Sequence, residues 1–196
     1  MQACHLSASD LACRRGDRLL FRGLDLALHG GDALYIAGPN GIGKTSLLRI
    51  LAGLLRPFAG VVARAGTIAL LDEKPALDPQ VPLTAALGFW ADLDGVGPHD
   101  RRACANHVGL TELLDVPVRF LSTGQRKRAA LTRIQGQQAP IWLLDEPLNG
   151  LDTAGIALAE SMVADHCAVG GIAVVASHQP MALPARKTIE LAAHAP

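Results

Sequence analysis

A glycine-rich segment between a short apolar run and an apolar helical pattern constrains this chain more than any other feature. Residues 38–45 fit the P-loop pattern G-x-x-x-x-G-K-S/T, after a predicted buried strand at residues 33–37 and before a helical pattern at residues 47–55. Glycines let successive N–H groups turn inward, and the helix N-terminus adds positive charge, so such a loop holds phosphates. The predicted phosphate- and nucleotide-binding residues here are Gly38, Pro39, Asn40, Gly41, Ile42, Gly43, Lys44, Thr45 and Ser46.

Two acids downstream complete the chemistry that a P-loop needs. Residues 141–144 are apolar, typical of a buried strand, and Asp145 and Glu146 follow directly. We expect Lys44 to reach the β- and γ-phosphates, and Thr45 and Asp145 to hold Mg²⁺. Glu146, one residue further, would polarise a water for in-line attack. The sequence therefore predicts a Mg²⁺-dependent site that hydrolyses a nucleoside triphosphate such as ATP.

Apolar strands alternate with helical patterns along most of the chain. Predicted strands at residues 67–71, 141–144 and 172–176 join the one before the P-loop, and helices are predicted from residue 122 and at about residues 155–167. This order favours an α/β fold with a parallel sheet, whose functional groups lie at the carboxyl ends of the strands. Between the strand at residues 67–71 and the helix from residue 122, prolines separate helical fragments such as residues 84–93, which predicts an inserted helical subdomain.

Composition narrows the possible partners and compartments. The 196 residues carry 18 basic and 18 acidic side chains, a formal net charge of zero, so no basic footprint for nucleic acid exists. Scattered cysteines fit free thiols, and the first residues lack a signal peptide pattern, so we expect a cytosolic chain. Residues 166–185 are uncharged but interrupted by glycine and proline, so we expect no membrane span.

A second motif precedes the acidic pair. Residues 121–125 read Leu-Ser-Thr-Gly-Gln and begin a helix with three basic residues. Alone, this is also the pattern of an ordinary N-capped helix. Together with the P-loop and the acidic pair, in this order, it resembles the LSGGQ signature of ATP-binding cassette (ABC) ATPases, with Thr123 in place of a glycine.

The resemblance implies a fold and an assembly. It implies an α/β P-loop NTPase with a RecA-like parallel sheet core, an N-terminal antiparallel β portion and a helical subdomain at about residues 75–127, all within one domain of residues 1–196. It implies that two copies pack head to tail, so that the signature of one meets the ATP of the other. The residues in that contact would be Ser122, Thr123, Gly124 and Gln125, with Asp152 in the D-loop and His178 touching the γ-phosphate.

At two positions the sequence departs from the ABC pattern. The family places an aromatic residue ahead of the P-loop to stack on adenine, whereas this chain offers Arg14 or Arg15, whose guanidinium can also stack on a base. The family also has a glutamine after the strand at residues 67–71, whereas Lys74 stands here, followed by Pro75. A protonated lysine cannot bind Mg²⁺, so the resemblance leaves coupling or hydrolysis at this edge open.

Within the ABC family, residues 38–54, 139–147 and 170–180 are most similar to ATP-binding subunits of bacterial cytochrome c maturation, the haem exporter type. This similarity implies a homodimeric ATPase at the cytoplasmic face of the bacterial inner membrane, bound to integral membrane subunits and acting indirectly on a haem-loaded chaperone. An ATPase of another small ABC transporter is the alternative. A soluble ABC ATPase acting on nucleic acid or ribosomes is disfavoured by the length and the neutral charge.

Overall fold

The computed structural model describes residues 4–184 and 186–195, with side chains omitted at residues 98–101. The strands are β1 (His5–Arg15), β2 (Arg18–His29), β3 (Ala33–Ala37), β4 (Ala59–Ala65), β5 (Ile68–Leu71), β6 (Ile141–Asp145), β7 (Ile172–Ala176) and β8 (Arg186–Glu190). The α-helices are α1 (Lys44–Ala52), α2 (Leu83–Asp94), α3 (Pro98–His107), α4 (Thr123–Gly136) and α5 (Thr153–Ala168). Short 3₁₀ helices lie at Thr111–Leu113, Val118–Phe120 and Leu191–His194.

The central sheet is parallel, with the strand order β5-β6-β7-β3-β8. Because successive side chains of a strand point to opposite faces, each inner strand contributes to two separate cores. On β6, Trp142 and Leu144 belong to the core shared with α4 and α5, while Ile141 and Leu143 belong to the core shared with α1. A sheet that is covered on both faces needs strands that are apolar throughout. For this reason, continuous apolar runs in the sequence predicted these strands. The predicted α/β fold class is confirmed.

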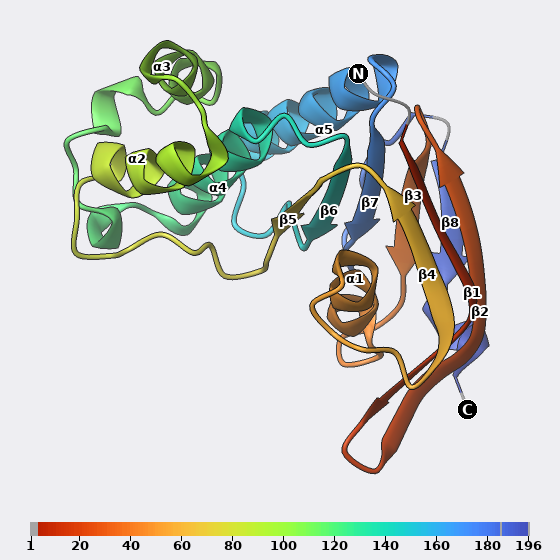
Figure 1. The fold of residues 1–196 in the computed structure, drawn as a ribbon. Coiled ribbons are helices and arrows are strands. Elements are labelled where there is room, and N and C mark those ends of the chain that lie inside the picture. The colour runs from red at the N-terminus through yellow and green to blue at the C-terminus, as the bar shows by residue number, and fades with distance from the viewer. Residues whose placement is uncertain (1–3, 185, 196) are drawn as a thin grey trace.

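A smaller antiparallel sheet, ordered β2-β1-β4, covers the α1 side of the molecule (Figure 1). Leu6, Leu11 and Phe21 from this sheet are buried in the same core as α1. The family resemblance implied an N-terminal antiparallel β portion, but the sequence analysis gave no separate prediction of β4 or β8. Both of these are largely exposed, so they lack the continuous apolar run that identifies a buried strand.

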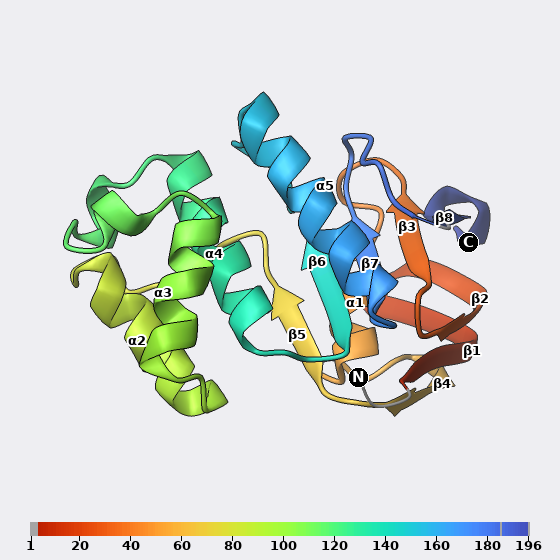
Figure 2. The same ribbon diagram turned by 90° about the horizontal axis from the view of Figure 1, so that it is seen from above.

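Helices occupy the chain between β5 and β6. Helices α2 and α3 lie at the end of the molecule opposite the antiparallel sheet, and α4 connects them to the parallel sheet (Figure 2). The predicted helix at residues 84–93 falls inside α2. Treating residues 75–127 as a separate subdomain remains a prediction.

The sheet order brings four loops to one edge. Strands β5, β6, β7 and β3 are adjacent and parallel, so the residues that follow them all emerge at the carboxyl edge of the sheet. Register places Asp145 opposite Ala176, and Ile36 opposite the same residue on the other side of β7. Among residues 4–184 and 186–195, no helix is long and apolar enough to cross a membrane.

Candidate functional site

The P-loop encloses one side of a cavity of about 380 Å³ at the carboxyl edge of the sheet. Gly43 precedes α1 with φ +119°, a left-handed conformation that favours glycine, and a Cβ there would lie 3.3 Å from Leu20 and Phe21. Lys44 is buried, and its Nζ donates hydrogen bonds to the carbonyls of Gly38 at 2.7 Å and Pro39 at 3.4 Å. The cavity, called here the P-loop cavity, is lined by Leu20, Asn40, Gly41, Gly43, Lys44, Thr45, Ser46, Glu73, Asp145, Glu146, Asn149 and His178.

Thr45 and Asp145 meet across this cavity although they are far apart in the sequence. The Thr45 hydroxyl Oγ1 donates to Asp145 Oδ2 at 2.7 Å. Burial raises the pKa of the Asp145 carboxyl, the Thr45 hydrogen bond lowers it, and the charge of Glu146 raises it again. A nearby cation would favour the ionised carboxylate. The hydroxyl and carboxylate oxygens are hard donors of the kind that Mg²⁺ prefers.

This pair does not form a complete metal cage. Within the described part of the chain, no three His, Cys, Asp or Glu side chains are grouped to hold a metal ion. Mg²⁺ in phosphate sites is commonly bound by one or two protein oxygens together with substrate phosphates and waters. The donors present at Thr45 and Asp145 therefore fit Mg²⁺ bound with a nucleotide.

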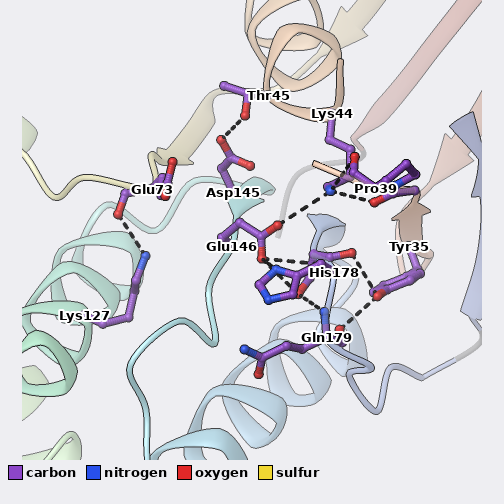
Figure 3. Close-up of polar contacts among 12 residues, drawn as sticks. Tyr35, Pro39, Lys44, Thr45, Glu73, Lys127, Asp145, Glu146, His178 and Gln179 are labelled. Atoms are coloured by element: carbon purple, nitrogen blue, oxygen red, sulfur yellow. Dashed lines mark hydrogen bonds and ion pairs between the residues drawn. The ribbon is translucent and has the colours of Figure 1, made fainter. Parts of the chain in front are cut away.

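Glu146 is the most highly connected side chain of the cavity (Figure 3). His178 Nδ1 lies 2.8 Å from Glu146 Oε2, the Ser177 hydroxyl donates to the same oxygen at 3.3 Å, and Lys44 Nζ lies 3.7 Å from Oε1. Its backbone φ is +47°, in the left-handed region, and its N–H donates to Ala176 O at 2.8 Å. For a non-glycine residue this conformation costs on the order of 1–2 kcal/mol, and such strain is typical of functional sites.

Tyr35 on β3 fixes the loop that carries His178. Its hydroxyl lies 3.0 Å from Ser177 O and 2.9 Å from Gln179 O, so it brackets His178 from both sides along the chain (Figure 3). Sequence reasoning missed Tyr35, because its position inside an apolar strand suggested only a core residue. The hydroxyl in that run was the available signal, since a buried tyrosine needs a hydrogen-bond partner.

The signature residues lie outside the P-loop cavity of their own chain. Ser122 and Gln125 form a reciprocal capping box at the start of α4, with the Gln125 N–H donating to Ser122 Oγ at 3.2 Å and the Ser122 N–H donating to Gln125 Oε1 at 2.8 Å. Locally, then, the segment is the N-capped helix that the pattern also allowed. Thr123 lines a neighbouring cavity with Lys74 and Lys127.

The turn after Glu146 is in close contact with the start of α4. A Cβ at Gly124 would lie 2.6 Å from the Gly150 carbonyl oxygen, and a Cβ at Gly150 would lie 2.6 Å from Thr123 Cγ2. Asp152 caps α5 by accepting from the Gly155 N–H at 2.9 Å, and its other oxygen lies 3.9 Å from Arg128 of α4. The start of α4 and the turn before α5 are therefore packed together, with Ser122, Thr123 and Asp152 exposed and Gly124 buried between the two segments.

Arg15 and Lys74, at the two positions where the sequence departs from the ABC pattern, do not line the P-loop cavity. Arg15 is exposed near the β1–β2 turn, and Leu20, which the sequence gave no reason to select, lines the cavity instead. Lys74 is exposed and borders an adjoining cavity that Thr45, Asp72 and Asp145 also line. Their predicted roles remain predictions. Gly38, Pro39 and Ile42 complete the loop without lining the cavity.

Glu73 and Asn149 line the P-loop cavity although the sequence analysis did not select them. Glu73 immediately precedes Lys74. The sequence analysis therefore selected the correct loop, but the side chain of that loop that lines this cavity is Glu73 and not Lys74. Asn149 lies in the same turn as Gly150, and its position three residues after Glu146 was the available signal.

Comparison with known proteins agrees with this arrangement. The sequence model of the ABC transporter family matches residues 21–149 of this chain. The cytochrome c biogenesis ATP-binding export protein CcmA of Novosphingobium aromaticivorans is 56% identical over 191 residues, covering 97% of both chains. CcmA of Sphingopyxis alaskensis is 53% identical, covering 91% of this chain and 92% of that protein.

Among solved structures, a putative ABC transporter ATP-binding protein from Pyrococcus furiosus has a TM-score of 0.86 and 22% identity, covering 98% of this chain and all of the other. At this identity the likeness establishes the fold. With the family match, the high identity to two export proteins and the P-loop cavity, the conclusion is direct: the chain is an ATPase that belongs to the ABC transporter family, in the branch of the cytochrome c biogenesis ATP-binding export proteins.

Proposed function

We propose that this chain is the ATP-hydrolysing subunit of a membrane export complex that serves cytochrome c biogenesis. The observation that carries the proposal is the convergence of Lys44, Thr45, Asp145, Glu146 and His178 on one cavity. A second support is the 56% identity, over nearly the whole chain, to a protein named for that export role.

In the proposed reaction, the P-loop N–H groups and Lys44 hold the triphosphate. Thr45 and Asp145 hold Mg²⁺, which supplies charge neutralisation on the phosphates. Glu146 accepts a proton from the attacking water, and His178, in contact with the same carboxylate, orients it and reaches the γ-phosphate. Lys44 Nζ lies 3.7 Å from Glu146 Oε1, so the proposed base and the phosphate-binding lysine are neighbours in the cavity.

The proposed working form is a head-to-tail homodimer. Ser122, Thr123, Gly124 and Gln125 of one copy would complete the ATP site of the other, with Asp152 beside them. Two observations support it: these residues lie outside the P-loop cavity of their own chain, and Ser122 and Thr123 are exposed at the N-terminus of α4, where the helix dipole favours an anion.

We further propose that the homodimer binds integral membrane subunits at the cytoplasmic face of the bacterial inner membrane. Hydrolysis then releases a haem-loaded chaperone on the other side, without direct contact between chaperone and ATPase. The neutral net charge is consistent with a protein partner and disfavours direct nucleic-acid binding.

The test of the site is Lys44→Ala in the full chain, expressed with its membrane subunits. ATP turnover should be lost and nucleotide affinity should fall, because the triphosphate loses its cation. Lys187→Ala on β8 is the control, since Lys187 pairs with Asp32 at the surface and should leave turnover unchanged. Turnover at the wild-type rate in Lys44→Ala would refute the site.

The test of the cellular role is complementation. A host strain that lacks its own ATPase of this type should recover mature c-type cytochromes with the wild-type chain and fail to recover them with Lys44→Ala. Recovery of cytochromes with Lys44→Ala would contradict the export role.

A further inference from the structure

Lys127 is a buried lysine that the proposed mechanism does not use. It lies on α4 five residues after Ser122, within a basic run that reads in the sequence as a solvated helix face, yet only 2% of it is exposed. Its ammonium donates a hydrogen bond to the backbone carbonyl of Glu73 at 3.2 Å (Figure 3). Burial lowers the pKa of Lys127, and the charges of Asp145, Glu73 and Glu146 raise it. A buried cation is costly, and an apolar residue of similar volume is often the more stable choice, so packing alone does not explain a lysine here.

The hydrogen bond joins two parts of the site that are 54 residues apart in sequence. Glu73 belongs to the segment that leaves β5, and residues 72–81 have no helix or strand of their own. On the opposite side, Asp72 accepts from Arg49 of α1 at 3.3 Å, and further along Ala76 O accepts from Trp90 Nε1. Lys127 therefore ties this loop to the signature helix at Glu73, the residue whose side chain lines the P-loop cavity.

We infer that Lys127 is a positioning residue for ATP hydrolysis: it holds the loop after β5 so that the Glu73 side chain faces the P-loop cavity beside Thr45 and Asp145. The inference rests on the proposed ATPase site. Lys127 lines the adjoining cavity with Thr123 and Lys74 rather than the P-loop cavity, so it acts through Glu73 and not on the nucleotide. Through the same hydrogen bond, a displacement of the start of α4 would also displace the loop after β5.

The first experiment measures loop order directly. Lys127→Met keeps the length and the apolar stem and removes the ammonium, and hydrogen–deuterium exchange is followed for peptides covering residues 72–82 in the full chain. Faster exchange in this loop, with unchanged exchange in β6 and β7, is expected. Lys187→Met is the matched control, because it removes a lysine from the surface of β8 and should leave the loop unchanged. Unchanged exchange of the loop in Lys127→Met would overturn the inference.

The second experiment separates a positioning role from a structural one by kinetics. Lys127→Met should lower kcat on the order of tenfold while the KM for ATP changes by less than about threefold, since misplacement acts on the reacting geometry. Lys127→Arg keeps a cationic donor and should recover most of the rate. A rate for Lys127→Arg as low as that of Lys127→Met would contradict the role of the hydrogen bond. Should Lys127→Met fail to fold, Lys127→Leu, which also lacks a donor, replaces it in both experiments with the same criteria.

A double-mutant cycle tests whether Lys127 works through Glu73. Glu73→Ala alone should lower kcat, and adding Lys127→Met should cause little further loss, because both changes remove the same positioned group. Fully additive losses would place Lys127 outside this pathway. Lys44→Ala, measured alongside, separates failure of the proposed function from failure of this inference. If Lys44→Ala is active, the proposed ATP site itself is refuted. If Lys44→Ala is inactive but Lys127→Met is fully active, only the role of Lys127 is refuted.

Discussion

The imidazole of His178 and the carboxylate of Glu146 are in direct contact, with Nδ1 2.8 Å from Oε2. An ionised carboxylate can only accept, so with Glu146 ionised this ring nitrogen is the donor of the contact. The carboxylate also receives the Ser177 hydroxyl and lies 3.7 Å from the Lys44 ammonium. Groups from the P-loop and from the loop after β7 therefore hold the proposed base in one orientation without a bound substrate.

Replacing Glu146 by glutamine should separate ATP binding from hydrolysis. The amide keeps the size of the side chain but cannot accept the proton of water, so turnover should fall below about a tenth of the wild-type rate while nucleotide affinity is kept. Turnover in the full chain and a nucleotide-binding titration measure the two effects. Glu190→Gln on the exposed strand β8 is the control. Hydrolysis by Glu146→Gln above that level would mean that Glu146 is not the base.

The same variant tests the homodimer. Trapped ATP should hold two copies together, so light scattering at several concentrations should report a monomer without nucleotide and a dimer of Glu146→Gln with saturating ATP. A mass that stays monomeric with ATP, with the membrane subunits also present, would exclude the proposed contact of Ser122 and Gly124 with a second copy.

Gly124→Ala should disturb the contact between α4 and the turn after Glu146. Its Cβ would lie 2.6 Å from the Gly150 carbonyl oxygen, so one of the two segments must shift, at a cost of about 1–3 kcal/mol in the free energy of unfolding. Denaturant unfolding measures it, and ATP-dependent dimerisation should also weaken. Gly136→Ala on the same helix is the control, because its Cβ meets only Val96 at 3.7 Å and alanine favours helix. Equal stability of the two variants would contradict this prediction.

Lys74→Gln should change hydrolysis modestly. Lys74 is exposed and borders the cavity that Thr45 and Asp145 also line, so its charge acts on the site through solvent, and a change of about threefold in turnover with weaker ATP binding is expected. Nucleotide titrations with and without Mg²⁺ separate a contact to the phosphates from one to the metal. Affinity and turnover identical to those of the wild type in both series would place Lys74 outside the site.

His166 should make stability depend on pH. Its ring is buried, stacks on Trp142 with centroids 4.0 Å apart, and lies 3.2 Å from Ile172 O through Nε2. Burial lowers the pKa of His166 below its ordinary value of 6.5, and its backbone hydrogen bonds raise it only in part. The unfolded chain thus binds the proton more readily than the folded one, so stability should decrease as the pH falls from 6.5 toward the folded-state pKa.

Thermal unfolding between pH 7.5 and 5.5 measures this dependence. The phenylalanine variant His166→Phe keeps the stacked ring and removes the titration, so its Tm should fall less over this range than that of the wild type. Equal slopes in the two proteins would show that another group controls the acid sensitivity.

The sequence predicted the parallel core because its strands are apolar on both faces, and it predicted the motif loops because the P-loop and the acidic pair carry their chemistry in consecutive residues. It did not predict β8, whose exposed polar residues lack a period, or the inclusion of Leu20 and Glu73 in the cavity. Those positions depend on which loops the strand order makes adjacent, and no local pattern encodes that. Lys127 shows the same limit, since a basic run reads as exposed until the packing of α4 against the loop after β5 is known.

Strand β3 has two structural roles, and the second depends on the Tyr35 hydroxyl. The strand leads directly into the P-loop at its carboxyl end, and through Tyr35 it also holds the backbone on both sides of His178. The positions of Lys44 and His178 thus both depend on the same short strand, β3. Because protein interiors are close-packed and transmit displacement, a small shift of β3 carries both groups in the same direction and preserves the spacing between the two sides of the cavity.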